Sequence, residues 1–314
     1  MRGRSVATDK FGAVFKTAFV RNLIMRNLPA LTLLSLFLCT ASLANEPVEK
    51  VQFTSLDMQN GAPIMLDALW FKAKNAARGS IIALHGCGGL YSTRKGHEQE
   101  LNARHENMAQ LLQDNGYNVL MPDSFRPRGV NSICTTNYKT RDITTDNRRL
   151  DVQAAMQWLI RQTGTQNIGL LGWSNGGSTT LNALNTAHTT TIPNAIYPRA
   201  AVVFYPGCQP SLRARPAYQL STPLLILTGA DDDWTPAQPC IDLEKKLGPD
   251  AIKLTVFANS YHDFDAPNLP VKKRLDVPNG VHPGAGVTTG SNPEAKEIAY
   301  REMLDFFAHH LGKK

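Results

Sequence analysis

Short, uninterrupted apolar runs alternate with amphipathic stretches along most of this chain. The run at residues 80–85 has almost no polar interruption, which is typical of a strand that is buried on both faces. The stretch at residues 147–162 instead repeats its apolar side chains at helical spacing. The pattern predicts strands at residues 51–55, 64–71, 80–85, 117–121, 168–172, 200–205, 224–228 and 252–257, and helices at residues 97–115, 147–162, 175–185, 237–247 and 294–311.

Buried strands that alternate with helices predict parallel strands joined by helical crossovers. We therefore expect an α/β fold, a mostly parallel sheet of about eight strands with helices on both faces. One domain of this kind would use residues 45–314. Residues 265–292 are rich in Pro and Gly and interrupt the pattern, so we expect there a long loop that acts as a lid or rim.

The first 44 residues are organised like a signal peptide. Arg21 and Arg26 precede an apolar run at residues 28–38, and small residues then lead to Ala44. The run is short for a membrane span. We expect cleavage after Ala44, export to the periplasm or the medium, and no stable membrane insertion afterwards. Met25 is an alternative start that also gives a well-proportioned signal peptide.

The positive charge of the chain is concentrated in this leader. The formal net charge is +7, but residues 1–44 hold six of the 33 basic residues and one of the 26 acidic residues. The remainder is close to neutral, which gives no electrostatic reason to expect nucleic acid as a partner. The spacings of His and Cys match no zinc pattern, so we expect no metal and no cofactor.

Four cysteines follow the expected cleavage site. An even number of cysteines in an exported chain indicates two disulfides, and four buried thiols are the alternative. Cys208 and Cys240 both lie shortly after predicted strands, so we favour a bond between them. Cys87 would then pair with Cys134.

Residues 172–177 read Gly-Trp-Ser-Asn-Gly-Gly and contain the G-x-S-x-G motif. The motif follows a predicted strand and opens a predicted helix, which is the setting of a nucleophile elbow. The glycines let the backbones pass closely, so that the Ser174 hydroxyl is presented at the turn. The alternative is a tight glycine turn with an idle serine.

A serine hydroxyl needs a base to accept its proton, and in elbow enzymes an acid and then a histidine follow the serine in the chain. Asp232 lies just past the seventh predicted strand, and His262 just past the eighth. Asp231 and Asp233 are rivals for the acid, with turn formation or helix capping as their alternative role. The later histidines lie in the long loop or in the last helix, where they fit poorly.

Residues 85–89 (His-Gly-Cys-Gly-Gly) end the third predicted strand. We expect the backbone N–H groups of Cys87 and Asn175 to form an oxyanion hole. The alternatives for the glycine run are a simple turn or a phosphate loop, but the lysine of a P-loop is missing.

Six segments of the chain carry a family resemblance: residues 85–89, 122–129, the Ser174 elbow, and residues 205–208, 232–236 and 261–264. Together they resemble the dienelactone hydrolase family of α/β-hydrolases over residues 50–312. The resemblance implies the α/β-hydrolase fold and a cofactor-free hydrolase of small-molecule esters or lactones. In that reading Ser174 forms the acyl-enzyme, His262 is the general base and Asp232 orients it. True dienelactone hydrolases carry Cys as nucleophile, so Ser174 puts chlorocatechol-pathway chemistry in doubt.

The resemblance also suggests substrate contacts. Arg126 and Arg128 fall near the place where such enzymes put cations for a substrate carboxylate, and Trp173 is a further candidate. Alternative functions are a serine peptidase, a polyester depolymerase, or a binding protein that keeps the fold without activity. Nothing in the sequence indicates the oligomeric state.

Overall fold

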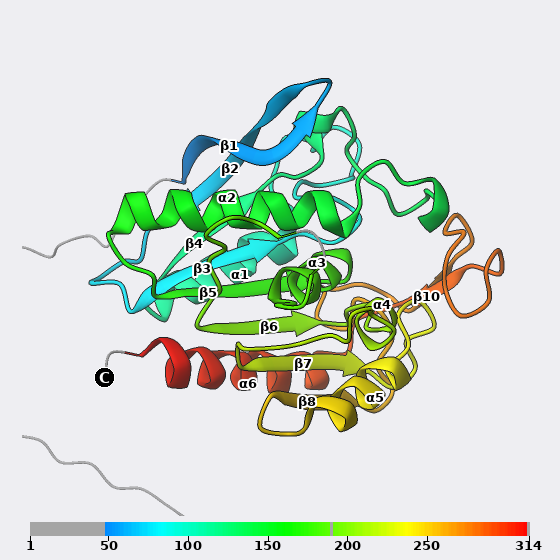
Figure 1. The fold of residues 1–314 in the computed structure, drawn as a ribbon. Coiled ribbons are helices and arrows are strands. Elements are labelled where there is room, and N and C mark those ends of the chain that lie inside the picture. Colours follow the sequence, from blue (N-terminus) through cyan, green and yellow to red (C-terminus); the bar gives the residue numbers. More distant parts are fainter. Residues whose placement is uncertain (1–47, 189–190, 313–314) are drawn as a thin grey trace, which may run out of the picture. The chain divides into compact units, whose positions relative to one another are not determined.

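The computed structural model describes residues 48–188 and 191–312; the predicted signal peptide and its two alternative starts lie outside these residues. An eight-stranded sheet runs in the order β1-β2-β4-β3-β5-β6-β7-β8 (Figure 1). The first two strands run antiparallel to their neighbours, whereas β3 to β8 pair in parallel. The predicted, mostly parallel sheet is therefore confirmed. Its strands are β1 (Glu49–Gln59), β2 (Ala62–Phe71), β3 (Gly79–Leu84), β4 (Tyr117–Pro122), β5 (Ile168–Trp173), β6 (Ala200–Phe204), β7 (Leu224–Gly229) and β8 (Ile252–Phe257).

The central strands are buried on both faces, as the uninterrupted apolar runs predicted. In β3, Ile81 and Ala83 point into one hydrophobic layer, and Ile82 and Leu84 point into the other. Successive side chains of a strand face opposite sides of a sheet, so each layer receives every second residue. Each Leu or Ile buried in this way contributes roughly 1.5–3 kcal/mol, which favours an apolar residue at every position.

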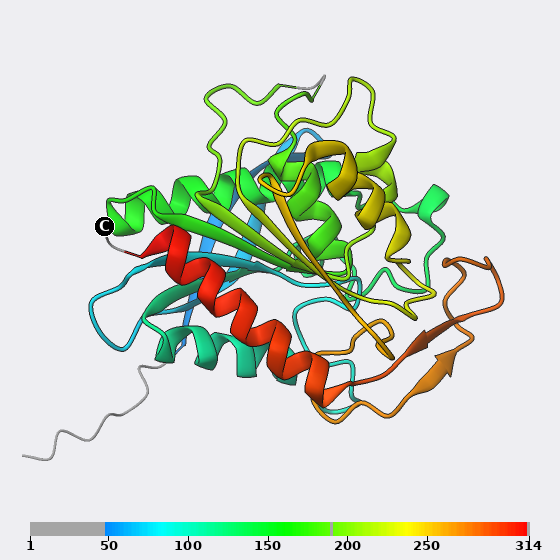
Figure 2. The ribbon, with the colours of Figure 1, turned by 90° about the horizontal axis from the view of Figure 1, so that it is seen from below.

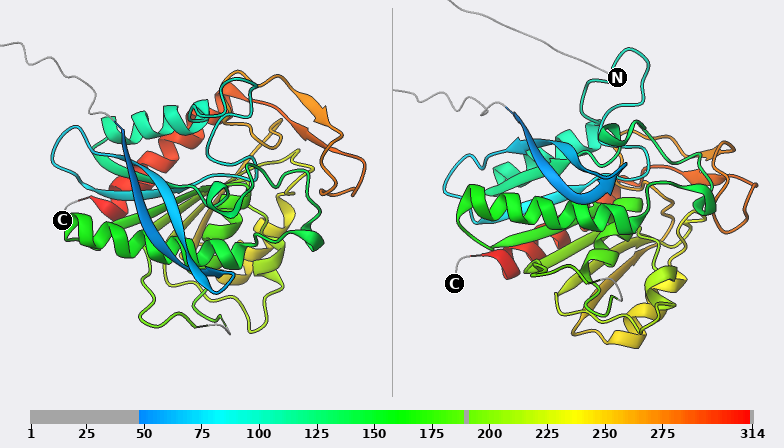
Figure 3. Two further views of the ribbon diagram at one scale, coloured as in Figure 1. Left: turned by 90° about the horizontal axis from the view of Figure 1, so that it is seen from above. Right: turned by 45° about the horizontal axis from the view of Figure 1, so that its top comes forward.

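Helices cover both faces of the sheet. The layer on one face includes α1 and α6, which lie along the same side in Figure 2, and the layer on the other includes α2, α3 and α5. The β1–β2 hairpin crosses α2 (Figure 3), where the rings of Phe53 and Trp158 lie 6.0 Å apart. Among the described residues, no helix is long and apolar enough to cross a membrane. The helices are α1 (Ala103–Asp114), α2 (Thr145–Thr163), α3 (Asn175–Leu184), α4 (Gln209–Leu212), α5 (Gln238–Leu247) and α6 (Pro293–Leu311), with 3-10 turns η1 (Arg126–Arg128) and η2 (Tyr138–Thr140).

Two elements differ from the prediction. The helix expected from residue 97 begins at Ala103, because Asn102 caps it by accepting a hydrogen bond from the backbone N–H of Arg104. The long loop at residues 265–292 contains a short antiparallel pair, β9 (Lys272–Arg274) and β10 (Val287–Thr289). Strands of three residues are too short to produce a readable alternation, so the sequence pattern did not show them.

Both predicted disulfides are confirmed. One joins Cys208, at the start of α4, to Cys240 within α5. The other joins Cys87, past the end of β3, to Cys134 in the connection between η1 and η2. Both bonds lie beyond the carboxyl ends of the parallel strands, the edge at which α/β proteins place their functional groups.

Candidate active site

Ser174 occupies the turn between β5 and α3 in a backbone conformation that few residues adopt. Its φ is 51° and its ψ is −115°, which is a strained geometry for a residue with a side chain. A Cβ on Gly176 would lie 2.1 Å from the carbonyl oxygen of Leu84, and one on Gly172 would lie 2.5 Å from the carbonyl oxygen of Gly176. Only glycine fits at either position. The two glycines of the G-x-S-x-G motif therefore allow this turn to pack against β3.

The structure brings Ser174, His262 and Asp232 together. His262 Nε2 lies 2.9 Å from Ser174 Oγ, and His262 Nδ1 lies 2.8 Å from Asp232 Oδ2. The three residues follow β5, β8 and β7, respectively, and all are buried. With Nδ1–H donating to Asp232, Nε2 is left to accept the hydroxyl proton of Ser174.

The three adjacent aspartates differ in their surroundings. Asp232 Oδ1 accepts the backbone N–H groups of Trp234 and Thr235, which hold its other oxygen towards His262. Asp233 instead accepts hydrogen bonds from the backbone and hydroxyl of Thr288 in β10. Asp231 is exposed. Of the three rivals, the structure therefore places only Asp232 against the histidine.

Burial and charge act in opposite directions on His262. Burial lowers its pKa, while the neighbouring carboxylate of Asp232 and the more distant one of Asp263 raise it, and the net result is a raised pKa. The rings of Tyr205 and Trp234 lie on the imidazole, each with its centroid 4.6 Å away. They limit its rotation, so the imidazole stays between the serine and the aspartate.

The glycine loop after β3 lies beside the elbow. A Cβ on Gly86 would be 3.4 Å from the carbonyl oxygen of Trp173, and Cys87 lines the same cavity as Ser174 and Asn175. The carbonyl of Cys87 accepts the N–H of Ile133 at 2.8 Å, which adds to the disulfide in fixing this loop. Since the first N–H groups of a helix have no partner within the helix, the Asn175 N–H at the start of α3 is available to a ligand.

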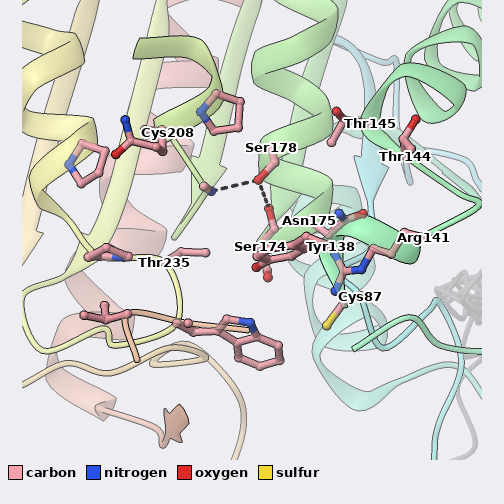
Figure 4. Close-up of a pocket in the computed structure, with 18 of the residues that line it drawn as sticks. Cys87, Tyr138, Arg141, Thr144, Thr145, Ser174, Asn175, Ser178, Cys208 and Thr235 are labelled. Atoms are coloured by element: carbon pink, nitrogen blue, oxygen red, sulfur yellow. Dashed lines mark hydrogen bonds between the residues drawn. The ribbon is translucent and has the colours of Figure 1, made fainter. Parts of the chain in front are cut away.

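A cavity of about 600 Å³ opens beside the Ser174 hydroxyl (Figure 4). Its walls come from helix starts and connections rather than from strands: the segment before α2, the start of α3, the segment around α4, the segment between β7 and α5, and the turn at Gly280 and Val281. Much of the wall is apolar. The apolar lining includes Ile143, Pro210, Trp234, Pro236, Pro239 and Val281, and the polar lining includes Tyr138, Arg141, Thr144, Thr145, Ser178 and Gln209.

The three expected substrate contacts are not on this cavity. Arg128 is buried in ion pairs with Asp57 and Asp151, each at 2.8 Å. Arg126 lies over the ring of Tyr91, in a separate depression. These positions correct our expectation of a substrate contact at either arginine: one guanidinium is paired with carboxylates inside the fold, and the other lines a depression that does not include Ser174.

Trp173 is also withdrawn from the cavity, because it lies wholly in the core and donates its indole N–H to Asp265 at 2.9 Å. The cation that does line the cavity is Arg141. Its guanidinium donates to the carbonyls of Ile133 and Thr136 and lies over the Tyr138 ring (Figure 4). Arg141 and Tyr138 belong to the connection between β4 and α2, which carries no motif, so nothing in the sequence marked them as cavity residues.

A buried charge network supports the histidine loop from behind. Asp265 is fully buried and accepts the hydroxyl of Tyr205 at 2.5 Å and that of Tyr300 at 3.3 Å. Arg104 reaches it from α1, with Nε 3.2 Å from Asp265, and also binds Asp263 at 2.7 Å. Burial and the Asp265 carboxylate raise the pKa of both tyrosines well above the usual range. The phenols therefore stay protonated and donate to the carboxylate.

Within the described residues, no three His, Cys, Asp or Glu side chains are grouped so that they could hold a metal ion.

Comparison with known proteins identifies the family of this chain. A model of the dienelactone hydrolase family matches residues 67–311. The chain belongs to the dienelactone hydrolase family. The resemblance inferred from the sequence is thereby confirmed, and so is the α/β-hydrolase fold.

Individual members of the family are distant from this chain. The carboxymethylenebutenolidase homolog of Rattus norvegicus is 28% identical over 166 residues, which make up 50% of this chain and 62% of the relative. The chain thus matches about three fifths of that curated protein's length.

Among solved structures, a putative dienelactone hydrolase from Klebsiella pneumoniae has a TM-score of 0.57 at 15% identity, covering 84% of this chain and 99% of that one. Thermogutta terrifontis esterase 2, phosphoramylated by tabun, has a TM-score of 0.54 at 16% identity, covering 86% and 96%. At these identities the likeness shows a shared fold.

The charge network predicts that Asp265→Asn lowers the free energy of unfolding by about 3–5 kcal/mol, because it removes one carboxylate from a buried pair. Urea denaturation measures the change. The matched control is Asp276→Asn, which breaks the exposed pair with Arg274 and should cost less than about 1 kcal/mol. Equal effects of the two substitutions would show that burial of the network contributes nothing.

Proposed function

We propose that this protein is a serine hydrolase that cleaves carboxylic esters or lactones through an acyl-enzyme on Ser174. The observation that carries the proposal is the hydrogen-bonded chain from Ser174 Oγ to His262 Nε2 at 2.9 Å and from His262 Nδ1 to Asp232 at 2.8 Å. The hydrogen-bonded residues lie beside a cavity of about 600 Å³, and a volume of that order suits a small-molecule substrate.

The reaction proceeds in two halves. Ser174 Oγ attacks the substrate carbonyl while His262 Nε2 takes its proton, and Asp232 stabilises the imidazolium. The tetrahedral oxyanion accepts hydrogen bonds from the N–H groups of Cys87 and Asn175. His262 then gives its proton to the leaving alkoxide, and the alcohol departs, or stays attached in a lactone. Water attacks the acyl-enzyme by the same route, which releases the acid and restores the serine.

The wall of the cavity limits the substrate. Trp234, Ile143 and Val281 offer an apolar surface close to the serine, which suits an apolar acyl or alcohol group. Arg141, Tyr138 and neighbouring hydroxyls add polar contacts to the same cavity. Esters and lactones of modest size that combine an apolar part with a polar one are therefore the substrates we expect.

Ser174→Ala is expected to lower kcat/KM on p-nitrophenyl esters by at least about 10⁴-fold. A panel from acetate to palmitate measures this loss and also the acyl-chain preference. Ser178→Ala is the matched control, because that hydroxyl lines the same cavity and contacts the carbonyl oxygen of Ser174 without reaching His262; it should change kcat/KM by less than about tenfold.

A fluorophosphonate probe gives a second readout of the same serine. Thermogutta terrifontis esterase 2 is itself phosphoramylated by an organophosphorus agent, so the reagent class suits the fold. The wild-type protein and Ser178→Ala should be labelled, and Ser174→Ala should not. A wild-type protein that hydrolyses no ester and takes up no probe would favour a binding protein instead.

The pH dependence follows from His262, which must be neutral to accept the serine proton. Because its folded pKa is raised, kcat/KM should fall as pH drops through a value above the usual histidine range. Asp232→Asn removes the carboxylate that raises this pKa, so the inflection should move to lower pH and the rate should fall by about 10⁴-fold. Asp233→Asn, whose carboxylate binds Thr288, should leave the inflection in place; a shift in both variants would contradict the assignment of the acid.

We also propose that the protein is exported. Two disulfides suit an oxidising compartment, and the first 44 residues fit a signal peptide. Mass spectrometry of the protein recovered from a Gram-negative host should find an N-terminus at Asn45. Recovery of the intact leader on a cytosolic protein would contradict this.

A further inference from the structure

Arg148 in α2 is a buried cation with no carboxylate in direct contact, and the carboxylates of Asp151 and Asp123 act on it only from beyond ion-pair distance. Its side chain is 1% exposed, and among the described residues it forms no ion pair within 4.0 Å. Asp151, one turn further along the same helix, is bound instead by Arg128 and by the hydroxyl of Ser55. Burial lowers the pKa of Arg148 to about 10, so the guanidinium remains charged at neutral pH.

The guanidinium joins the two segments that carry the proposed oxyanion donors. One terminal nitrogen donates to Asn175 Oδ1 at 2.5 Å, and the other donates to the carbonyl of His85 at 2.9 Å. Asn175 supplies one N–H of the oxyanion hole, and His85 lies two residues before Cys87, which supplies the other. One rigid, planar group therefore sets how far apart these two backbone segments lie.

The plane of this group is held by an aromatic side chain. Phe125 lies under the guanidinium with its ring centroid 5.1 Å from the central carbon, and the same ring packs edge-on against His85 at 4.5 Å. Arginine keeps its donors in a fixed fork, unlike lysine. Phe125, the Asn175 side chain and the His85 carbonyl together therefore hold the guanidinium of Arg148 in one orientation.

A buried charge that no carboxylate contacts directly is costly to the folded state. The cost falls when negative charge appears nearby, and in the proposed reaction that happens when the substrate carbonyl becomes an oxyanion between Cys87 and Asn175. We propose that Arg148 is a positioning residue for catalysis: it fixes the separation of the two oxyanion donors and adds positive charge behind them. This inference rests on the proposed hydrolase function and concerns the same site.

Arg148→Lys and Arg148→Met test the proposal in the full-length protein. Both should lower kcat on the best p-nitrophenyl ester, by about 10²-fold for Met, since loss of one oxyanion donor costs 10²–10³-fold, and by less for Lys. KM should change by less than about threefold. Affinity for a trifluoromethyl ketone analogue, which forms an oxyanion adduct on the serine, should fall in parallel with kcat/KM.

Asn175→Ala keeps the backbone N–H and removes the acceptor of Arg148, so it carries the test if Arg148→Met does not fold. A double-mutant cycle of Arg148→Lys with Asn175→Ala should show effects on kcat that are less than additive. Arg128→Lys is the matched control, a buried arginine paired with Asp57 and Asp151; it should lower the unfolding midpoint and leave kcat unchanged.

The outcomes separate the two proposals. An inactive wild-type protein whose Ser174 resists fluorophosphonate would overturn the hydrolase function itself. An active wild type, with Arg148→Lys and Asn175→Ala at wild-type kcat and ketone affinity, would overturn the role of Arg148 alone. A fall in the unfolding midpoint without any change in kcat would likewise show that Arg148 only supports the fold.

Discussion

The close passage of the β5–α3 turn over the end of β3 is the constraint on which the rest of the site depends. Gly176 approaches the carbonyl of Leu84 so closely that no side chain fits between them. That approach sets Ser174 and the amino end of α3 directly beside the loop that follows β3. The strain at Ser174 can persist because buried strands on both sides hold the turn in place. The position of the Ser174 hydroxyl is therefore set first by how the backbone packs, and the side chains around it act on that arrangement.

Two buried charge systems then secure what the turn presents, and they are built in opposite ways. The carboxylate of Asp265 is bound by an arginine and by two tyrosine hydroxyls, and this network holds the His262 loop in place. Around Arg148, the direct acceptors are a side-chain amide and a backbone carbonyl, and none of the described carboxylates lies within ion-pair distance. The first arrangement is typical of structural support. In the second arrangement, the buried positive charge becomes more stable when a negative charge forms beside it during the reaction. An electrostatic contribution to catalysis acts in this way, at the transition state, whereas a contribution to stability is already complete in the resting protein.

The sequence was sufficient where residue type and backbone geometry are tied together. The glycines around Ser174 permit one turn, and the uninterrupted apolar runs permit strands buried on both faces, so the sheet and the grouping of Ser174, Asp232 and His262 could be predicted. The sequence was insufficient for Arg128, because its partner Asp57 lies 71 residues away and an arginine that is paired inside a fold looks like one that awaits a ligand. Arg141 and Tyr138 lie in an irregular connection, where no periodicity marks which side chains turn inward.

The reacting groups and much of the cavity wall come from different parts of the chain, and this separation has an evolutionary consequence. The reacting groups lie at strand ends, and part of the wall lies beside them, whereas the rest of the wall is made by the connection before α2, the segment around α4 and the turn before β10. Connections of this kind tolerate substitution and insertion far better than a buried strand does. Under the proposed hydrolase function, descendants of this chain can therefore exchange one substrate for another by changes in this outer part of the wall. The machinery that breaks the bond is inherited intact, while substrate choice remains open to selection.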